Sequence, residues 1–134
     1  MTKRHINKIA YDVLGCAMEV SRNIGPGLLE SIYHEALLKE MSLRGMAVKS
    51  KVPVPVKYKG SKLKDDLILD ILVEDAVVVE LKSVEALNPV HQAQVLTYMK
   101  LTEKPKGLLI NFNSTNIHKS TIRLVNEYFR ELED

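Results

Sequence analysis

The sequence predicts a mixed α/β fold, in which a central β-sheet of about four strands is flanked by helices. Two features favour this fold. Segments with helical spacing of apolar residues lie at both ends of the chain, and Val- and Ile-rich segments with strand patterns lie between them. A helical segment also separates two of the expected strands, and such a crossover joins strands that run parallel. We therefore expect at least one parallel pair in the sheet.

Length and composition indicate one globular domain. The chain has 134 residues, of which 46% are hydrophobic and 27% charged, so we expect a single domain over residues 1–134. No apolar run is long enough to span a membrane, and no secretory signal is visible. Cys16 is the only cysteine, which excludes an internal disulfide and indicates a reducing, cytoplasmic location. A net charge of +2 is too small to indicate nucleic-acid binding by itself.

Two helices are expected first, over residues 5–23 and 28–44. In both segments, apolar residues recur every three or four positions. Gly25-Pro26-Gly27 ends the first helix, and Gly45 ends the second. The apolar face of the second helix is expected to consist of Leu29, Ile32, Ala36, Leu37 and Met41.

Strand patterns follow from residue 48. Residues 48–58 alternate with period two, and Pro53 and Pro55 place this strand at a sheet edge or interrupt it. Residues 67–82, LILDILVEDAVVVELK, predict a hairpin whose loop is Glu74-Asp75-Ala76.

The remaining elements alternate between helix and strand. Asn88-Pro89 is a strong helix start, and that helix is expected to end near residue 102. GLLINF, residues 107–112, is a continuous apolar run of the kind found in buried strands. Residues 120–132 are expected to be helical, because of the spacing of Ile122, Val125, Phe129 and Leu132.

The hairpin brings three charged side chains to one patch. A loop at residues 74–76 places Val73 opposite Val77, so that Asp70 lies opposite Glu80, and Lys82 shares their face. Two like charges at about 5 Å repel by roughly 3 kcal/mol at an effective dielectric of 20. A divalent cation would compensate this repulsion, since Mg²⁺ prefers carboxylate oxygens. The alternative is a salt-bridged hairpin in which Lys82 neutralises the two acids.

Two further groups are notable for their spacing. Gln94 and Tyr98 lie four residues apart, on one face of the expected crossover helix. Gly27, Glu30 and Tyr33 stand at the head of the second helix, where the helix dipole favours an acid. Taken singly, the first pair is typical of a partly exposed helix face. The second group is typical of a helix-start acid followed by a core tyrosine.

Together these groups resemble a known family. Gly27-x-x-Glu30-x-x-Tyr33 resembles the motif of the GxxExxY proteins, a group within the PD-(D/E)XK nuclease-like superfamily. The resemblance continues through VPVPVKYKG, LDILVED, VVVELKSVEALNPVHQAQVLTYMK and GLLINFN, and so covers roughly residues 5–115. It implies a restriction-endonuclease-like core. The order of Glu30, Asp70, Glu80-x-Lys82 and Gln94-x-x-x-Tyr98 is similar to that of the exonuclease-type branch.

The resemblance implies a metal site. Asp70 and Glu80 would bind Mg²⁺ or Mn²⁺, with the backbone carbonyl of Leu81 as a further ligand. Glu30 would reach the ion from its helix, directly or through a bound water. No small-molecule cofactor is implied. The expected partner is nucleic acid, with DNA favoured, and the reaction is phosphodiester hydrolysis.

The resemblance also implies roles for three other side chains. Lys82 would position or deprotonate the attacking water and stabilise charge on the phosphate. Gln94 and Tyr98 would orient Lys82 or contact the nucleic-acid backbone. One position departs from the family pattern, because Ile68 stands where relatives often carry a polar or basic residue. An alternative function is therefore a catalytically inactive nuclease-like module that binds nucleic acid or a protein partner. The oligomeric state and the choice between DNA and RNA stay open.

Overall fold

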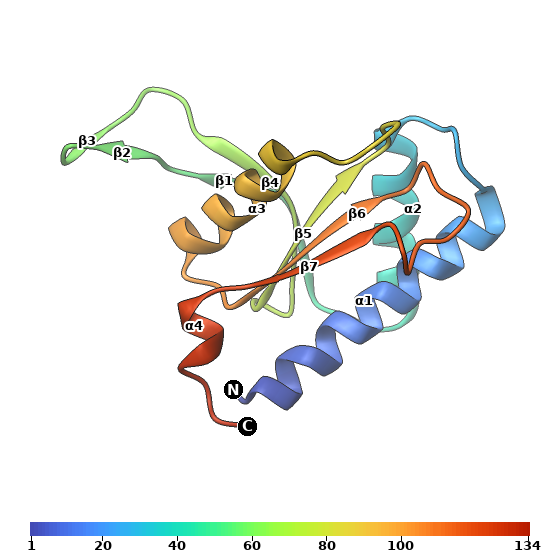
Figure 1. The fold of residues 1–134 in the computed structure, drawn as a ribbon, viewed down its shortest axis with the longest axis horizontal. Helices are drawn as coiled ribbons and strands as arrows, with labels where there is room; N and C mark the ends of the chain where they lie inside the picture. Colours follow the sequence, from blue (N-terminus) through green and yellow to red (C-terminus); the bar gives the residue numbers. More distant parts are fainter.

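A five-stranded mixed sheet forms the centre of the structure, with helices on both of its faces (Figure 1). The computed structural model describes residues 1–134. The strands lie in the order β1-β4-β5-β6-β7, with β5 and β6 parallel and the other neighbours antiparallel. Their bounds are Val48–Val54 (β1), Leu67–Val73 (β4), Val77–Lys82 (β5), Lys106–Asn111 (β6) and Thr121–Val125 (β7). The predicted fold class, including one parallel pair, is confirmed.

Four helices and a short β-ribbon complete the fold. The ribbon pairs β2 (Lys57–Tyr58) with β3 (Ser61–Lys62) and projects away from the end of β1 and β4 (Figure 1). The helices are α1 (Lys3–Ile24), α2 (Glu30–Leu43), α3 (Pro89–Thr102) and α4 (Glu127–Arg130). None of them combines the length and the apolar character needed to cross a membrane.

Two apolar clusters fill the space between the sheet and its helices. One contains side chains of α1, α2 and one face of the sheet, and the other lies between α3 and the opposite face. Strand β5 shows the division by its alternation, since Val77 and Val79 belong to the first cluster and Val78 to the second. Glu80 has the parity of Val78 and therefore faces α3.

Several elements lie where the sequence predicts them. The hairpin register is confirmed, with Val73 opposite Val77. Strand β1, which contains Pro53, lies at the sheet edge, where a residue without an N–H is tolerated. Asn88 caps α3 through its side chain, and Pro89 is the first helical residue.

The prediction of a helix over residues 120–132 is wrong. Residues Thr121–Val125 form β7, which pairs with β6, and only Glu127–Arg130 are helical. The β-branched residues of this segment suit an extended strand, and pairing covers the edge of β6. The side chain of Asn126 then accepts a hydrogen bond from the Phe129 N–H and begins α4. This additional strand raises the sheet from about four strands to five.

The predicted apolar face of α2 is partly wrong. Leu29 and Ile32 are exposed, whereas Tyr33 is fully buried. The Tyr33 ring stacks on Phe112, which follows β6, with ring centroids 4.7 Å apart. This stack rotates α2 so that the row at four-residue spacing faces the sheet, namely Tyr33, Leu37 and Met41.

Candidate active site

The pairing of β4 with β1 is interrupted at Asp70. The ladder between β1 and β4 pairs Ser50 with Ile71 and then Val52 with Leu69, without a pair at Lys51 and Asp70. Leu69 belongs to the cluster under α3, whereas Ile71 belongs to the cluster under α1 and α2. The two neighbours of Asp70 therefore pack on opposite faces of the sheet.

Asp70 binds the neighbouring strand through its side chain. The paired register of β4 and β5 ends at Ile71 opposite Val79, one residue before the expected pair of Asp70 and Glu80. Instead, Oδ2 of Asp70 accepts a hydrogen bond of 2.9 Å from the backbone N–H of Leu81. The carboxylate thus replaces a ladder bond and holds β4 and β5 together where they diverge.

Glu80 is a buried acid beside this carboxylate. Its side chain projects from the central strand β5, and the residue is only 4% exposed. Oε1 of Glu80 has no hydrogen-bond partner, although such a group normally has one when it is buried. Burial raises the pKa of Glu80 to about 8, and the negative charge of Asp70 contributes to the rise. The two predicted acids therefore lie together, and burial and their mutual repulsion outweigh the nearby positive charge.

Lys82 lies beside the pair but does not neutralise it fully. Its Nζ atom is 3.9 Å from Oε2 of Glu80, which is an ion pair beyond ordinary hydrogen-bond length. The opposing charge lowers the pKa of Glu80, but less than burial and Asp70 raise it. The alternative interpretation of the sequence is a salt-bridged hairpin in which Lys82 neutralises both acids. In the structure, Lys82 does not fully compensate the two carboxylates.

Gln94 and Tyr98 meet β4 from α3. The Tyr98 hydroxyl donates a hydrogen bond of 2.9 Å to the carbonyl of Ile68, and Gln94 Nε2 donates to that hydroxyl at 3.3 Å. Burial raises the pKa of Tyr98, and the charges of Glu80 and Asp70 raise it further. The phenol is therefore close to both acids. Neither Gln94 nor Tyr98 hydrogen-bonds Lys82; Tyr98 instead holds the strand two residues before Asp70.

A cavity of about 240 Å³ reaches Asp70 from the α2 side. Glu30 lines it from the first position of α2, so that Glu30 and Asp70 face one space although 40 residues separate them in the chain. The complete lining consists of Glu30, Ser31, His34, Lys51, Asp70 and Leu81.

Three residues of this cavity, Ser31, His34 and Lys51, were not predicted as site residues. Lys51 lies in the edge strand β1, and its φ angle of 55° is left-handed, which is unusual for a residue with a side chain. His34 Nε2 lies 2.8 Å from Ser50 Oγ, and burial together with the charge of Lys51 lowers its pKa. Lys51 lies in a lysine-rich stretch of the kind found at solvated strand edges. Nothing in the sequence therefore distinguishes it from its solvated neighbours. His34 follows Tyr33 of the Gly-x-x-Glu-x-x-Tyr motif directly, and that adjacency was its only signal.

The donor set suits a hard divalent cation held by two acids. No three side chains of His, Cys, Asp or Glu lie close enough together to hold a metal ion between them. Mg²⁺, however, commonly takes one or two carboxylates and keeps several waters. The unpartnered oxygen of Glu80, beside Asp70, is the kind of group that such a cation satisfies. Glu30 does not form a three-acid cluster with Asp70 and Glu80. Of its two predicted contacts with an ion, direct or through a bound water, the one through water fits this arrangement.

Comparison with known proteins gives one match. The family model of the PD-(D/E)XK nuclease superfamily matches residues 7–124, from α1 to β7, a range that includes every candidate site residue. No curated protein and no solved structure matches the chain. The match is at the level of the superfamily, and the narrower resemblance to the GxxExxY group stays a prediction.

The pKa of Glu80 predicts a pH-dependent stability in the absence of metal. The folded-state pKa of about 8 exceeds the ordinary value of 4.5, so folding favours the protonated acid. The free energy of unfolding contributed by this group is therefore present below about pH 4.5 and lost as the pH rises through about 8. Glutamine cannot ionise, so Glu80→Gln removes this loss. Urea unfolding in EDTA should show wild type losing stability relative to Glu80→Gln between pH 5 and pH 9.

A matched variant controls for general charge effects in this experiment. Glu85 is exposed and follows β5 by three residues, so Glu85→Gln removes the same charge outside the site. Its stability should follow that of wild type across the pH range. Parallel curves for wild type and Glu80→Gln would contradict the raised pKa.

Proposed function

The chain belongs to the PD-(D/E)XK nuclease superfamily, and we propose that it is a metal-dependent nuclease that hydrolyses phosphodiester bonds of nucleic acid, with DNA as the favoured substrate. One observation carries the proposal. Asp70 and Glu80 lie together where β4 and β5 diverge; Oε1 of Glu80 is buried without a partner, and the Lys82 amine lies 3.9 Å from its Oε2. Two acids and a lysine in this order are what a metal-assisted hydrolysis requires.

The proposed ion is Mg²⁺ or Mn²⁺, held by Asp70 and Glu80 with the Leu81 carbonyl as a further ligand. When bound, the ion lowers the pKa of a coordinated water and neutralises phosphate oxygens. Asp70 is already fixed by its hydrogen bond to the Leu81 N–H, so the protein orders this ligand in advance. Glu30, across the same cavity, would bind through water.

The remaining side chains of the site act on substrate and water. Lys82, whose side chain is 18% exposed, can donate hydrogen bonds to the attacking water and to a phosphate oxygen. Lys51 lines the cavity with Asp70, and we assign its ammonium group to the substrate phosphate. Tyr98, with Gln94, is a positioning residue, since its hydroxyl holds the Ile68 carbonyl and thereby the segment that carries Asp70.

A second candidate function is a catalytically inactive module that binds nucleic acid or a protein partner. Two observations favour it. Ile68 is 47% exposed beside the site, at a position where relatives often carry a polar or basic residue. The described residues also contain no three-acid cluster for a metal. This alternative predicts partner binding that survives Lys82→Ala and no metal-dependent turnover.

A cleavage assay distinguishes the two functions. Purified protein should cleave at least one of single-stranded DNA, duplex DNA, branched DNA and RNA in Mg²⁺ or Mn²⁺, and EDTA should stop the reaction. Glu80→Gln and Lys82→Ala should each lower the rate by about 10²- to 10³-fold, the usual effect of removing a group that stabilises transition-state charge. Glu85→Gln should cleave like wild type.

Mn²⁺ binding provides a substrate-independent readout for the same experiment. Calorimetric titration should give binding heat with wild type and Lys82→Ala, but none with Asp70→Ala. Binding without cleavage of any substrate would favour the inactive module. Absence of both binding and cleavage in wild type would contradict the nuclease proposal.

The left-handed backbone of Lys51 allows a test that separates stability from activity. A non-glycine residue in this conformation costs roughly 1–2 kcal/mol, whereas glycine adopts it freely. Lys51→Gly and Lys51→Gln both remove the ammonium group, but only the glycine variant relieves the strain. We expect both to lower cleavage by about tenfold, in proportion to one lost charged hydrogen bond. Urea unfolding should show Lys51→Gly to be at least as stable as Lys51→Gln. Wild-type cleavage by both variants would exclude Lys51 from the site.

A further inference from the structure

A lysine occupies a core-facing position of the buried strand β6. Leu108 and Ile110 of this strand belong to the cluster under α1 and α2, and Lys106 has the same parity. Lys106 is only 8% exposed as a residue, but its ammonium group keeps contact with solvent and has no carboxylate partner. The Phe129 ring lies beside it, with its centroid 5.5 Å from Nζ. A ring face attracts a cation, but it accepts none of the three N–H groups in the way that an oxygen does.

A second cation lies on the same face of the sheet. Arg123 of β7 pairs with Leu108, so its side chain also faces α1. Its guanidinium contacts His118 Nδ1 at 3.3 Å and has no carboxylate partner. Burial lowers the pKa of Lys106, and the charge of Arg123 lowers it further. Two neighbouring cations, the largely buried Lys106 and the exposed Arg123, thus lack a carboxylate counter-charge.

These two cations share a cavity with α1. The cavity has a volume of about 230 Å³ and lies between the N-terminal half of α1 and strands β6 and β7. Asn7 and Tyr11 add an amide and a phenol to the lining, and the remaining members are Ala10 and Leu14. A guanidinium beside an ammonium, with neutral donors around them, is suited to a phosphate, whose oxygens accept several charge-assisted hydrogen bonds.

We propose that Lys106 and Arg123 bind a phosphate group in this cavity. The site is separate from the proposed nuclease site, since Lys106 faces α1, whereas Glu80 faces α3. The proposal does not rest on nuclease activity. The phosphate can belong to a nucleic-acid backbone or to a small phosphate compound, because both present the same oxygens.

The surroundings of the cavity favour a nucleic-acid backbone as the source. A neighbouring cavity of about 510 Å³ shares Tyr11, Leu14 and Arg123 and is also lined by Arg22, Arg44 and His118. Asp12 lies in this lining too, and Arg22 and Arg44 also pair with glutamates, but the arginines outnumber the one acid of the cavity. Cations spread over more room than one phosphate needs suit a chain of phosphates better than a single ion.

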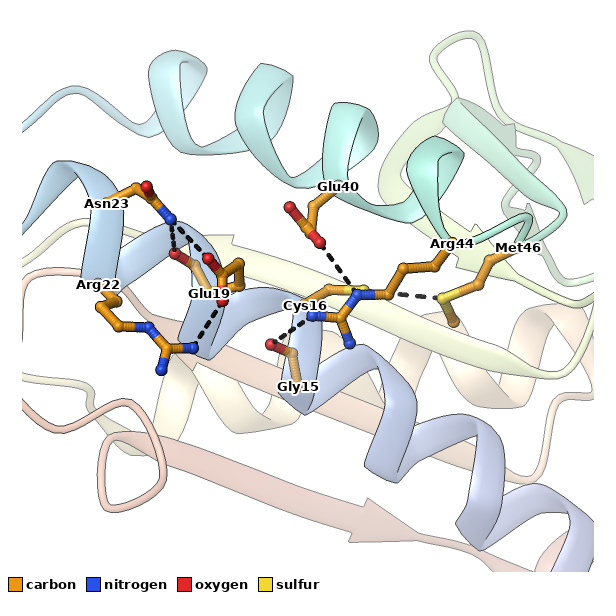
Figure 2. Close-up of polar contacts among 8 residues, drawn as sticks. All are labelled: Gly15, Cys16, Glu19, Arg22, Asn23, Glu40, Arg44 and Met46. Carbon is orange, nitrogen blue, oxygen red and sulfur yellow. Dashed lines mark hydrogen bonds and ion pairs between the residues drawn. The ribbon is translucent and has the colours of Figure 1, made fainter.

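Figure 2 shows how two of these arginines are held. Arg44, which follows α2, extends across α1 to the Gly15 carbonyl at 3.4 Å, and Glu40 fixes its Nε at 3.0 Å. A Cβ at Gly15 would lie 3.1 Å from Arg44 Nη1, so glycine leaves the room for this crossing. Arg22 is held by Glu19 at 2.6 Å. Arg22 and Arg44 are thus paired with glutamates, whereas Lys106 and Arg123 have no carboxylate partner.

The first test uses inorganic phosphate. Phosphate titrated into metal-free protein in EDTA, at constant ionic strength set with chloride, should raise the melting temperature of wild type. Lys106→Met and Arg123→Gln should each weaken the apparent phosphate affinity by at least tenfold. Lys106→Met keeps the apolar stem, so without phosphate it should melt close to wild type, which shows that the variant is folded.

Two further variants control for net charge and for the proposed nuclease site. Lys100→Gln removes an exposed cation from α3, which packs on the opposite face of the sheet. Glu80→Gln alters the proposed nuclease site. Both should respond to phosphate like wild type.

The second test uses labelled single-stranded and duplex oligonucleotides in EDTA. If the phosphate belongs to a backbone, Lys106→Met and Arg123→Gln should bind at least fivefold more weakly and show a smaller slope of log affinity against log salt, by about one per lost contact. Lys100→Gln should keep the slope of wild type. Weaker oligonucleotide binding identifies a nucleic-acid backbone, and weaker phosphate binding alone identifies a small phosphate compound. The proposal is overturned if neither probe loses affinity in both variants.

Discussion

Glu80 places a carboxylate in the interior of a sheet, next to a second carboxylate, without a sufficient counter-charge. Strand β5 is central and buried, so the side chain is only 5% exposed, and one of its oxygens has no partner. Neighbouring elements hold this arrangement in place. Asp70 is fixed to the Leu81 N–H, and Tyr98 is fixed to the Ile68 carbonyl. A structure that holds two acids together in this way stores an electrostatic cost that a cation relieves.

Much of the fold and the centre of the site could be predicted from local patterns. The tight acidic loop and the alternation of the hairpin fix the register near the turn, which places Asp70 and Glu80 just beyond the last pair, Ile71 with Val79. The start of α3 could be predicted because Asn88 and Pro89 act on the backbone beside them. These features depend on neighbours within a few residues, which a single sequence contains.

The features that sequence reasoning missed depend on contacts between distant segments. Residues 121–125 have a spacing compatible with a helix, but the open edge of β6 makes them a strand. The orientation of α2 follows from the stack of Tyr33 on Phe112, which are 79 residues apart. Lys51 and Lys106 were indistinguishable from solvated lysines, because a left-handed backbone and a largely buried lysine are consequences of the completed fold.

The two uncompensated charges of the sheet have opposite signs but cannot neutralise each other. Glu80 of β5 faces α3, whereas Lys106 of the neighbouring strand β6 faces α1. The sheet backbone separates them, so neither serves as the counter-charge of the other. The two faces therefore suit two different ligands, a divalent cation on one and a phosphate on the other.

Titration of the Glu80 side chain by ¹³C NMR, with and without Mg²⁺, tests the electrostatic origin of the site most directly. Without the ion, the side-chain carboxyl carbon of Glu80 should titrate with a pKa near 8, and saturating Mg²⁺ should lower this value because the ion favours the ionised acid. Titration near the ordinary value of 4.5, unchanged by Mg²⁺, would contradict the account.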